Sequence, residues 1–243
     1  MSFPRIARSC DHTFIASVLN PTSVIVDFGC NRGEFAHEII ARFGCSVYSA
    51  EPVRDLCLEI EPSPRLRLFQ VAITGSNEPV VIKFHHRRNA SILPELLHEA
   101  PAMNEIVEGV TLGEFLSRAE LSEVDLAKVD IEGAELSMFD AASDSELERV
   151  SQWTIEFHDF IYPELEEHVV RVKERMKRLG FWCINMSLDN TDVMLLNPER
   201  MGLKKIHYLY LSSIVKYREG AKRRFRAKRE RQLTVSKQID LDR

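Results

Sequence analysis

The feature that most constrains the fold is an apolar run that passes through a glycine-containing loop into a helical pattern. Residues 24–40 read VIVDFGCNRGEFAHEII. The apolar run breaks at Asp27, while Gly29 and Gly33 let the backbone approach a ligand without interference from a Cβ atom. The helix that starts after Gly33 offers unpaired N–H groups. In open α/β sheets such a loop lies beyond the carboxyl end of its strand, where ligands bind.

The composition of this loop favours a cationic nucleoside over a dinucleotide. Asp27 repels a pyrophosphate but suits an ammonium or a sulfonium, and the third glycine of the dinucleotide fingerprint is missing. Glu51 ends the next predicted strand, where a carboxylate can accept from both hydroxyls of a ribose. Gln70, Val71 and Ala72 follow one strand later and can lie along an adenine. The structural alternative is a tight turn, a solvated Glu51 and an ordinary apolar core.

Apolar runs rich in β-formers alternate with amphipathic helical patterns through most of the chain, which predicts a parallel sheet covered on both faces. The predicted strands are residues 23–28, 46–50, 66–71, 80–84, 124–130, 151–157, 181–186 and 192–196. The predicted helices are residues 33–42, 112–119, 134–139 and 163–179. A short polar turn joins the last two strands, which predicts an antiparallel hairpin at a sheet edge.

Length and cysteine content point to one large domain in a reducing compartment. The chain has 243 residues, of which 44% are hydrophobic, and this is enough for a sizeable α/β core. Its five cysteines are scattered, without a CxxC pair or a Cys/His cluster, so neither a disulfide framework nor a zinc site is indicated. The first residues lack the apolar stretch of a signal peptide, and no apolar run is long enough to span a membrane. We therefore expect a soluble, cytoplasmic protein with no transmembrane segment.

Charge is concentrated at the C-terminal end. The formal net charge is −5, yet residues 216–231 carry nine Lys/Arg against two Glu. Residues 201–232 lack proline and place apolar side chains at three- and four-residue intervals, which predicts one amphipathic helix. We therefore divide the chain into a catalytic domain over 1–200 and a basic helical extension over 201–243. Its apolar stripe is expected to dock on the domain or on a second copy in a homodimer, with the basic half facing an anionic partner; a merely solvated helix is the alternative.

The motifs VDFGCNRGEF, SAEP, QVAI, VTLGEFL, LAKVDIEGAEL and IEFH resemble, in order and approximate spacing, those of FkbM-type S-adenosylmethionine-dependent methyltransferases. KVDIEGAE is the most specific of them. The resemblance spans about residues 24–196. It implies a Rossmann-like, doubly wound, mostly parallel seven-stranded sheet with an antiparallel edge hairpin. It also implies a methyltransferase that uses S-adenosylmethionine and acts on a hydroxyl of a sugar, glycan or related small-molecule metabolite.

The resemblance assigns cofactor residues in three groups. The methionine part of the cofactor would be surrounded by Asp27, Gly29, Asn31 and Gly33. Glu51 would hold the ribose, and the strand-end argument above adds Val71 and Ala72 at the adenine. Asn89 and Ser91, in a serine-containing loop ahead of a helix, would border the cofactor; for Ser91 a simple helix N-cap is the alternative.

The catalytic prediction rests on carboxylates and a histidine at two strand ends. Asp130 would face the sulfonium and the incoming hydroxyl, Glu132 would orient the acceptor, and Glu135 would stabilise a helix N-terminus. His158, with an ordinary pKa, would remove the hydroxyl proton, oriented by Glu156 or Asp130. A structural histidine satisfied by a backbone carbonyl is the alternative. Asp130 and Glu132 also have the hard oxygens that Mg²⁺ prefers, although two carboxylates do not specify a metal.

Two other functions remain open at this level. Glu51 suits the ribose of a nicotinamide cofactor as well, so a dehydrogenase of the Rossmann type is the second enzyme class. The basic extension on its own is typical of a non-enzymatic protein that binds nucleic acid or another polyanion.

Overall fold

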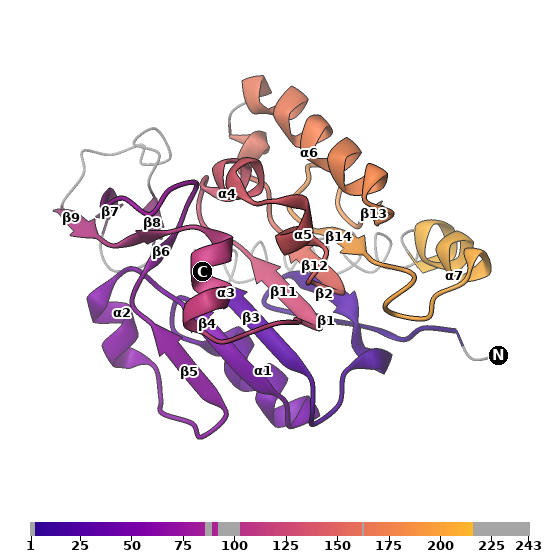
Figure 1. Ribbon diagram of the computed structural model, residues 1–243, viewed down its shortest axis with the longest axis horizontal. Helices are drawn as coiled ribbons and strands as arrows, with labels where there is room; N and C mark the ends of the chain where they lie inside the picture. The colour runs from indigo at the N-terminus through magenta and orange to yellow at the C-terminus, as the bar shows by residue number, and fades with distance from the viewer. Residues whose placement is uncertain (1–2, 86–88, 92–102, 162, 216–243) are drawn as a thin grey trace, which may run out of the picture.

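The computed structural model describes residues 3–85, 89–91, 103–161 and 163–215. Its centre is a seven-stranded sheet with the strand order β13-β14-β12-β11-β3-β4-β5 (Figure 1). β14 is antiparallel to β12 and to β13, and the other neighbouring pairs are parallel. This confirms the predicted mostly parallel sheet with an edge hairpin. Its strands are β3 (Val24–Phe28), β4 (Ser46–Ala50), β5 (Leu66–Phe69), β11 (Leu126–Val129), β12 (Gln152–Ile155), β13 (Trp182–Asn185) and β14 (Val193–Leu196).

Alternation along the strands gives the sheet two apolar faces. Ile25 and Leu126 point to one face and pack against α1 (Glu34–Phe43). Phe28 and Val129 point to the other face, in the larger core that includes side chains of α3 (Leu112–Arg118), α4 (Glu135–Ala141) and α6 (Glu166–Arg178). Short helical segments complete the connections: η1 (Ala16–Val18), α2 (Arg54–Glu59), α5 (Asp144–Leu147), η3 (His158–Phe160) and η4 (Pro163–Leu165).

An N-terminal hairpin that the sequence patterns do not reveal covers part of the α1 face. β1 (Ile6–Ser9) and β2 (His12–Ile15) are joined by the two-residue turn Cys10 and Asp11, both at positive φ. Such turns normally carry Asn-Gly or Asp-Gly, so this sequence lacks the usual signal. Buried polar side chains tie the hairpin to the sheet. Gln152 accepts from and donates to the backbone of Ile15, and Asp192 accepts from the backbone N–H of Thr13 at 3.1 Å.

The predicted strand over 66–71 is shorter than expected. It ends at Phe69, because the chain turns there and the N–H of Val71 donates to the carbonyl of Phe69 at 3.1 Å. The chain continues as β6 (Ala72–Ile73), which pairs with β10 (Gly109–Val110) outside the main sheet. A separate three-stranded sheet follows, formed by β7 (Val80–His85), β8 (Asn89–Ser91) and β9 (Met103–Val107). Asn89 and Ser91 therefore lie in a strand and not in a loop.

The C-terminal helix starts later than predicted. Residues 201–204 are irregular, and α7 (Lys205–Leu209) continues into the π-helical segment η5 (Tyr210–Val215). Leu211 is fully buried against Ile15 and Met194, whereas Ile206 and Leu209, two apolar residues of the predicted helix, are exposed. The basic half of the extension lies outside the described residues.

Candidate functional site

The loop between β3 and α1 has the tight geometry that its glycines predict. Gly29, Asn31 and Gly33 all have positive φ, between 51° and 74°. A Cβ atom on Gly29 would lie 1.8 Å from the carbonyl oxygen of Asp130. Only glycine permits this approach of the loop to the end of β11, and the contact brings the two loops that carry the predicted cofactor and catalytic residues together.

Glu51 fixes the other side of this loop. Its side chain is buried at the end of β4, where one carboxylate oxygen accepts from the N–H of Asn31 at 2.9 Å and the other from the N–H of Val53 at 3.0 Å. Burial raises the pKa of Glu51 to about 7, against the effect of these two hydrogen bonds. A carboxylate oxygen has more than one lone pair, so both oxygens can still accept from a ribose.

A cavity of about 570 Å³ opens between the loops at the carboxyl edge of the sheet. Seven predicted site residues line it: Gly29, Asn31, Glu51, Val71, Ala72, Asp130 and Glu132. Apolar side chains, among them Leu56, Ile73 and Ile82, surround the end with Val71 and Ala72, and the carboxylates of Asp130 and Glu132, the predicted catalytic residues, lie after β11. This division fits an adenosine on the apolar side and a charged sulfonium near the carboxylates.

The other predicted cofactor residues do not line this cavity. Asp27 is fully buried under the loop, and Gly33 forms the start of α1 with φ 74°. Asn89 and Ser91 lie in β8, and their side chains are outside the described part of the structure. Contact of these four residues with the cofactor remains a prediction.

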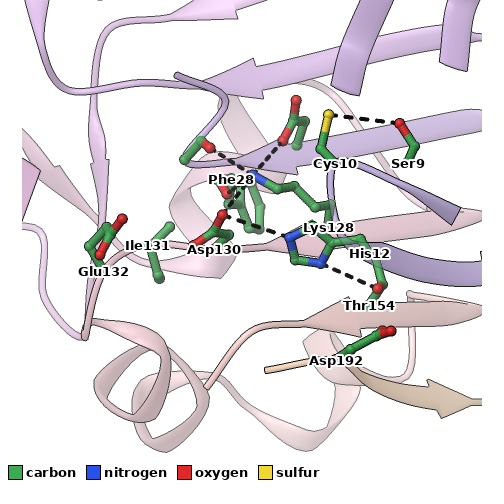
Figure 2. Close-up of polar contacts among 12 residues, drawn as sticks. Ser9, Cys10, His12, Phe28, Lys128, Asp130, Ile131, Glu132, Thr154 and Asp192 are labelled. Carbon is green, nitrogen blue, oxygen red and sulfur yellow. Dashed lines mark hydrogen bonds and ion pairs between the residues drawn. The ribbon is translucent and has the colours of Figure 1, made fainter. Parts of the chain in front are cut away.

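Lys128, which the sequence analysis did not select, is the cation at the centre of the site (Figure 2). Its buried ammonium donates to the carbonyl of Gly29 at 2.7 Å, and lies 3.3 Å from Asp27 Oδ1 and 3.6 Å from Asp130 Oδ2. Burial alone would lower the pKa of Lys128, but the two carboxylates outweigh it and raise this pKa. Asp27 thus already faces a cation of the protein, a partner that the sequence analysis did not anticipate.

Asp130 stays ionised in this environment. Burial by itself would raise the pKa of Asp130, but Lys128 and the neighbouring histidines hold it well below its usual range. Its side chain is 27% exposed, so it can still reach a ligand in the cavity.

His158 is held between carboxylates at the start of η3. Its Nδ1 lies 2.9 Å from Glu135 Oε1 and its Nε2 3.3 Å from Glu132 Oε2. Burial would lower the pKa of His158, but the hydrogen bonds to Glu132 and Glu135 raise it to about 11. His158 is therefore an imidazolium at neutral pH, which differs from the ordinary pKa expected from sequence. Its neighbours along the chain give no hint of this, because Glu132 comes from the β11–α4 connection and Glu135 from the first residue of α4.

Glu135 does more than the helix-terminal role predicted for it. It is buried at the first residue of α4, and Oε1 accepts from the N–H groups of Ile131 and Gly133 at 3.2 and 3.1 Å. These bonds hold the loop in which Glu132 adopts a positive φ of 51°. A non-glycine residue at such a φ is strained, and strain of this kind is frequent at functional sites.

His12 of the N-terminal hairpin is the second residue that sequence reasoning missed. It is fully buried, with Nδ1 3.4 Å from Thr154 Oγ1 and Nε2 3.7 Å from Asp130 Oδ2 (Figure 2). A lone histidine in a short N-terminal strand carries no recognisable motif. Only the docking of the hairpin brings it to the catalytic carboxylates.

The family model of the FkbM methyltransferase domain matches residues 27–183. No curated protein sequence matches the chain. Among the described residues, no helix has both the length and the apolar character needed to cross a bilayer.

Several solved structures are similar to the chain. Fibrillarin from Aeropyrum pernix, with natively bound S-adenosyl-L-methionine, is 10% identical over 79% of this chain and 81% of its own, with a TM-score of 0.44. An rRNA methylase from Streptococcus thermophilus is 15% identical over 74% of this chain and 90% of its own, at a TM-score of 0.40. For a putative methyltransferase from an antibiotic biosynthesis pathway of Anabaena variabilis the identity is 14% and the TM-score 0.31, with 70% of this chain covered; the chain spans 62% of that protein. Similarity at this level says nothing about substrate.

Proposed function

The chain belongs to the FkbM methyltransferase family and is an S-adenosylmethionine-dependent methyltransferase, and from this premise we propose that it methylates a hydroxyl of a sugar, glycan or related small metabolite. The observation that carries the proposal is the position of Asp130 and Glu132 at the wall of the cavity, beside the loop that holds Gly29. The family match decides against a nicotinamide-dependent oxidoreductase. All five cysteines are free thiols, which supports a reducing, cytoplasmic location.

The cofactor would be held by residues from three strand ends. Glu51 would accept from the ribose hydroxyls, and Val71 and Ala72 would contact the adenine. Gly29 and Asn31 would border the methionine part. When bound, S-adenosylmethionine supplies an electrophilic methyl group on a sulfonium.

In the transfer the acceptor oxygen forms a bond to the methyl carbon, the carbon–sulfur bond breaks, and sulfur keeps the electron pair. The hydroxyl must also lose its proton. His158 is already protonated, and the low pKa of Asp130 makes it a weak base. Glu132 is the cavity carboxylate with the more exposed side chain, 40% against 27% for Asp130. We assign Glu132 as the proton acceptor and His158 as the cation that positions it, with alignment of the reactants as the larger contribution.

A Mg²⁺ ion bound between Asp130 and Glu132 is not part of this proposal. The imidazolium of His158 lies 3.3 Å from Glu132 and 4.0 Å from Asp130, and it already supplies positive charge to this pair. A cation bound there would face that charge at close range.

The proposal is tested by two measurements. Calorimetry is expected to show binding of S-adenosylhomocysteine and none of NADH. The protein is then incubated with S-adenosylmethionine carrying a labelled methyl group and a panel of monosaccharides, nucleotide sugars and oligosaccharides. Each acceptor that is labelled is compared with its deoxy analogue at the reacting position. Labelling that persists in the deoxy analogue, or that occurs only on amines or carboxylates, would overturn O-methylation.

For the basic extension we propose an anionic partner, such as a phosphorylated carrier, a membrane surface or a nucleic acid. Support comes from the charge of residues 216–231 and from the exposed Ile206 and Leu209 on α7 just before them. Deletion of residues 222–243 is expected to leave binding of S-adenosylhomocysteine unchanged and to abolish salt-sensitive binding to polyanions. If the full-length protein binds no polyanion at low salt, the extension is only a solvated helix.

A further inference from the structure

One buried nitrogen atom in the site makes no hydrogen bond, and neither the proposed reaction nor the fold accounts for it. The side chain of His12 is fully buried, yet its Nε2 has no hydrogen-bond partner among the described residues. The nearest carboxylate oxygen, Asp130 Oδ2, is 3.7 Å away, which is too long for a hydrogen bond. Leaving a buried polar atom unsatisfied costs about 1–3 kcal/mol, so the position calls for a partner.

The hydroxyl of Thr154 lies 3.4 Å from Nδ1 of His12 and can accept a hydrogen there or donate one. Binding of a metal ion to Nε2 requires the tautomer in which Nδ1 carries the hydrogen and Thr154 accepts it. Nε2 lies on the side of Asp130, where the ion would bind (Figure 2). A histidine fixed by a hydrogen bond at one nitrogen, with a free lone pair at the other, is the arrangement found in metal-binding histidines.

A third ligand stands on the neighbouring strand. Asp130 and Glu156 directly follow β11 and β12, and the N–H of Glu156 donates to the carbonyl of Val129 at 3.0 Å, which places the two residues side by side at the sheet edge. One ligand atom from each of His12, Asp130 and Glu156 can be chosen so that all lie within 4.8 Å of one another. Ligands of one ion at bond lengths near 2.1 Å lie roughly 3–4.2 Å apart, so small side-chain rotations suffice.

The local charge favours a cation here. Four carboxylates, those of Asp130, Glu132, Glu135 and Glu156, gather around the ends of β11 and β12. The positive groups that face them are the imidazolium of His158 and the ammonium of Lys128, and Lys128 also neutralises Asp27. His12 lies nearest Asp130 Oδ2, whereas His158 lies nearest Oδ1.

We propose that His12, Asp130 and Glu156 bind a divalent transition metal ion, with Mn²⁺, Fe²⁺ or Co²⁺ preferred over Mg²⁺ because one ligand is an imidazole nitrogen. Lys128 lies 3.6 Å from the same Asp130 Oδ2, but its hydrogen bond to the Gly29 carbonyl and its ion pair with Asp27 hold it in place, and Asp27 offsets its charge. An ion at this position would lower the pKa of a hydroxyl that binds to it, which connects the site with the proposed reaction. Binding of the ion itself does not depend on that reaction.

The test uses the full-length protein, freed of metal with a chelator and without cofactor or acceptor. Mn²⁺ is titrated in while free Mn²⁺ is followed by electron paramagnetic resonance and heat by calorimetry. We expect one saturable site per chain, Mg²⁺ bound about tenfold more weakly or worse, and at least about tenfold loss of Mn²⁺ affinity in both E156Q and H12Q. The matched control is H168Q, because His168 pairs with Asp140 on the surface.

Each other outcome overturns the proposal. Absence of saturable Mn²⁺ binding in the wild-type protein refutes the site, and equal affinity in E156Q and H168Q shows that the ion binds elsewhere. Mg²⁺ binding as tight as Mn²⁺ binding excludes the imidazole as a ligand. Because His12 is buried, circular dichroism first establishes that H12Q is folded; E156Q, at a half-buried position, keeps the test decisive if it is not. A failed acceptor screen with intact Mn²⁺ binding would count against the proposed substrate class and not against the metal site.

Discussion

Replacing Gly29 by alanine is expected to destabilise the protein much more than replacing Gly44, although both have positive φ, 72° and 66°. Gly44 ends α1, and a Cβ atom there would meet nothing closer than 3.8 Å. Gly44→Ala is therefore expected to lower the free energy of unfolding by about 1 kcal/mol. This is the strain of a left-handed alanine less the gain from a stiffer unfolded chain.

At Gly29 the same strain is joined by a collision with the backbone. The added Cβ would lie 1.8 Å from the carbonyl oxygen of Asp130 and 2.9 Å from its carbon, and a strand end cannot rotate away as a side chain can. Separation of the β3 loop from β11 adds a cost typical of overpacking, so we expect a total loss of roughly 3–4 kcal/mol. It would also stretch the hydrogen bond from Lys128 to the Gly29 carbonyl and reshape the cavity.

Urea unfolding followed by circular dichroism gives the free energy of unfolding of both variants and of the wild type. The slope of this free energy against urea concentration should be the same in all three. Calorimetry with S-adenosylhomocysteine adds the effect on binding, which is expected for Gly29→Ala and absent for Gly44→Ala. If the two variants lose the same stability, or if Gly29→Ala binds S-adenosylhomocysteine like the wild type, the close approach of these loops is not what the site requires.

Three further predictions concern the charged groups. Burial raises the pKa of Glu51 from 4.5 to about 7, so the protonated Glu51 side chain stabilises the folded state by roughly 3 kcal/mol below pH 4.5, and this stabilisation is lost as the pH rises through 7. Urea unfolding at pH 5 and pH 8 should show that the free energy of unfolding depends less on pH in Glu51→Gln than in the wild type. An unchanged pH dependence in the variant would contradict this. Lys128→Met should cost about 3–5 kcal/mol because it leaves Asp27 buried without a counter-charge, and adding Asp27→Asn should restore part of that loss; a double variant no more stable than the single one would refute the pairing. His158→Gln should lower kcat about tenfold or more while S-adenosylhomocysteine affinity changes little; wild-type kcat in this variant would remove His158 from the mechanism.

Much of the fold follows from local patterns in the sequence. Strand β4 was predicted at its observed bounds, and the edge hairpin of β13 and β14 follows from two apolar runs and a polar turn. Elements without a local signal were missed. The N-terminal hairpin turns through Cys10 and Asp11, which are not the usual turn residues, and its strands are stabilised by contacts with Gln152 and Asp192 far along the chain.

In the site, the sequence by itself identified the loops that line the cavity, because a glycine pair after a strand and carboxylates at strand ends are local features. Gly29, Glu51, Asp130 and Glu132 were predicted from such features and Asn31 from the family resemblance, and all five line the cavity.

Only the tertiary structure decided how the charges are balanced. Alternation predicts that Lys128 and Asp130 share a face of β11, but the register that sets Lys128 beside Asp27 belongs to the sheet. The protonation of His158 depends on Glu132 and Glu135, and His12 reaches Asp130 from the N-terminal hairpin, far away along the chain. Electrostatic energy depends on distances between groups that are far apart in the chain, and in a buried site these distances decide which groups are charged.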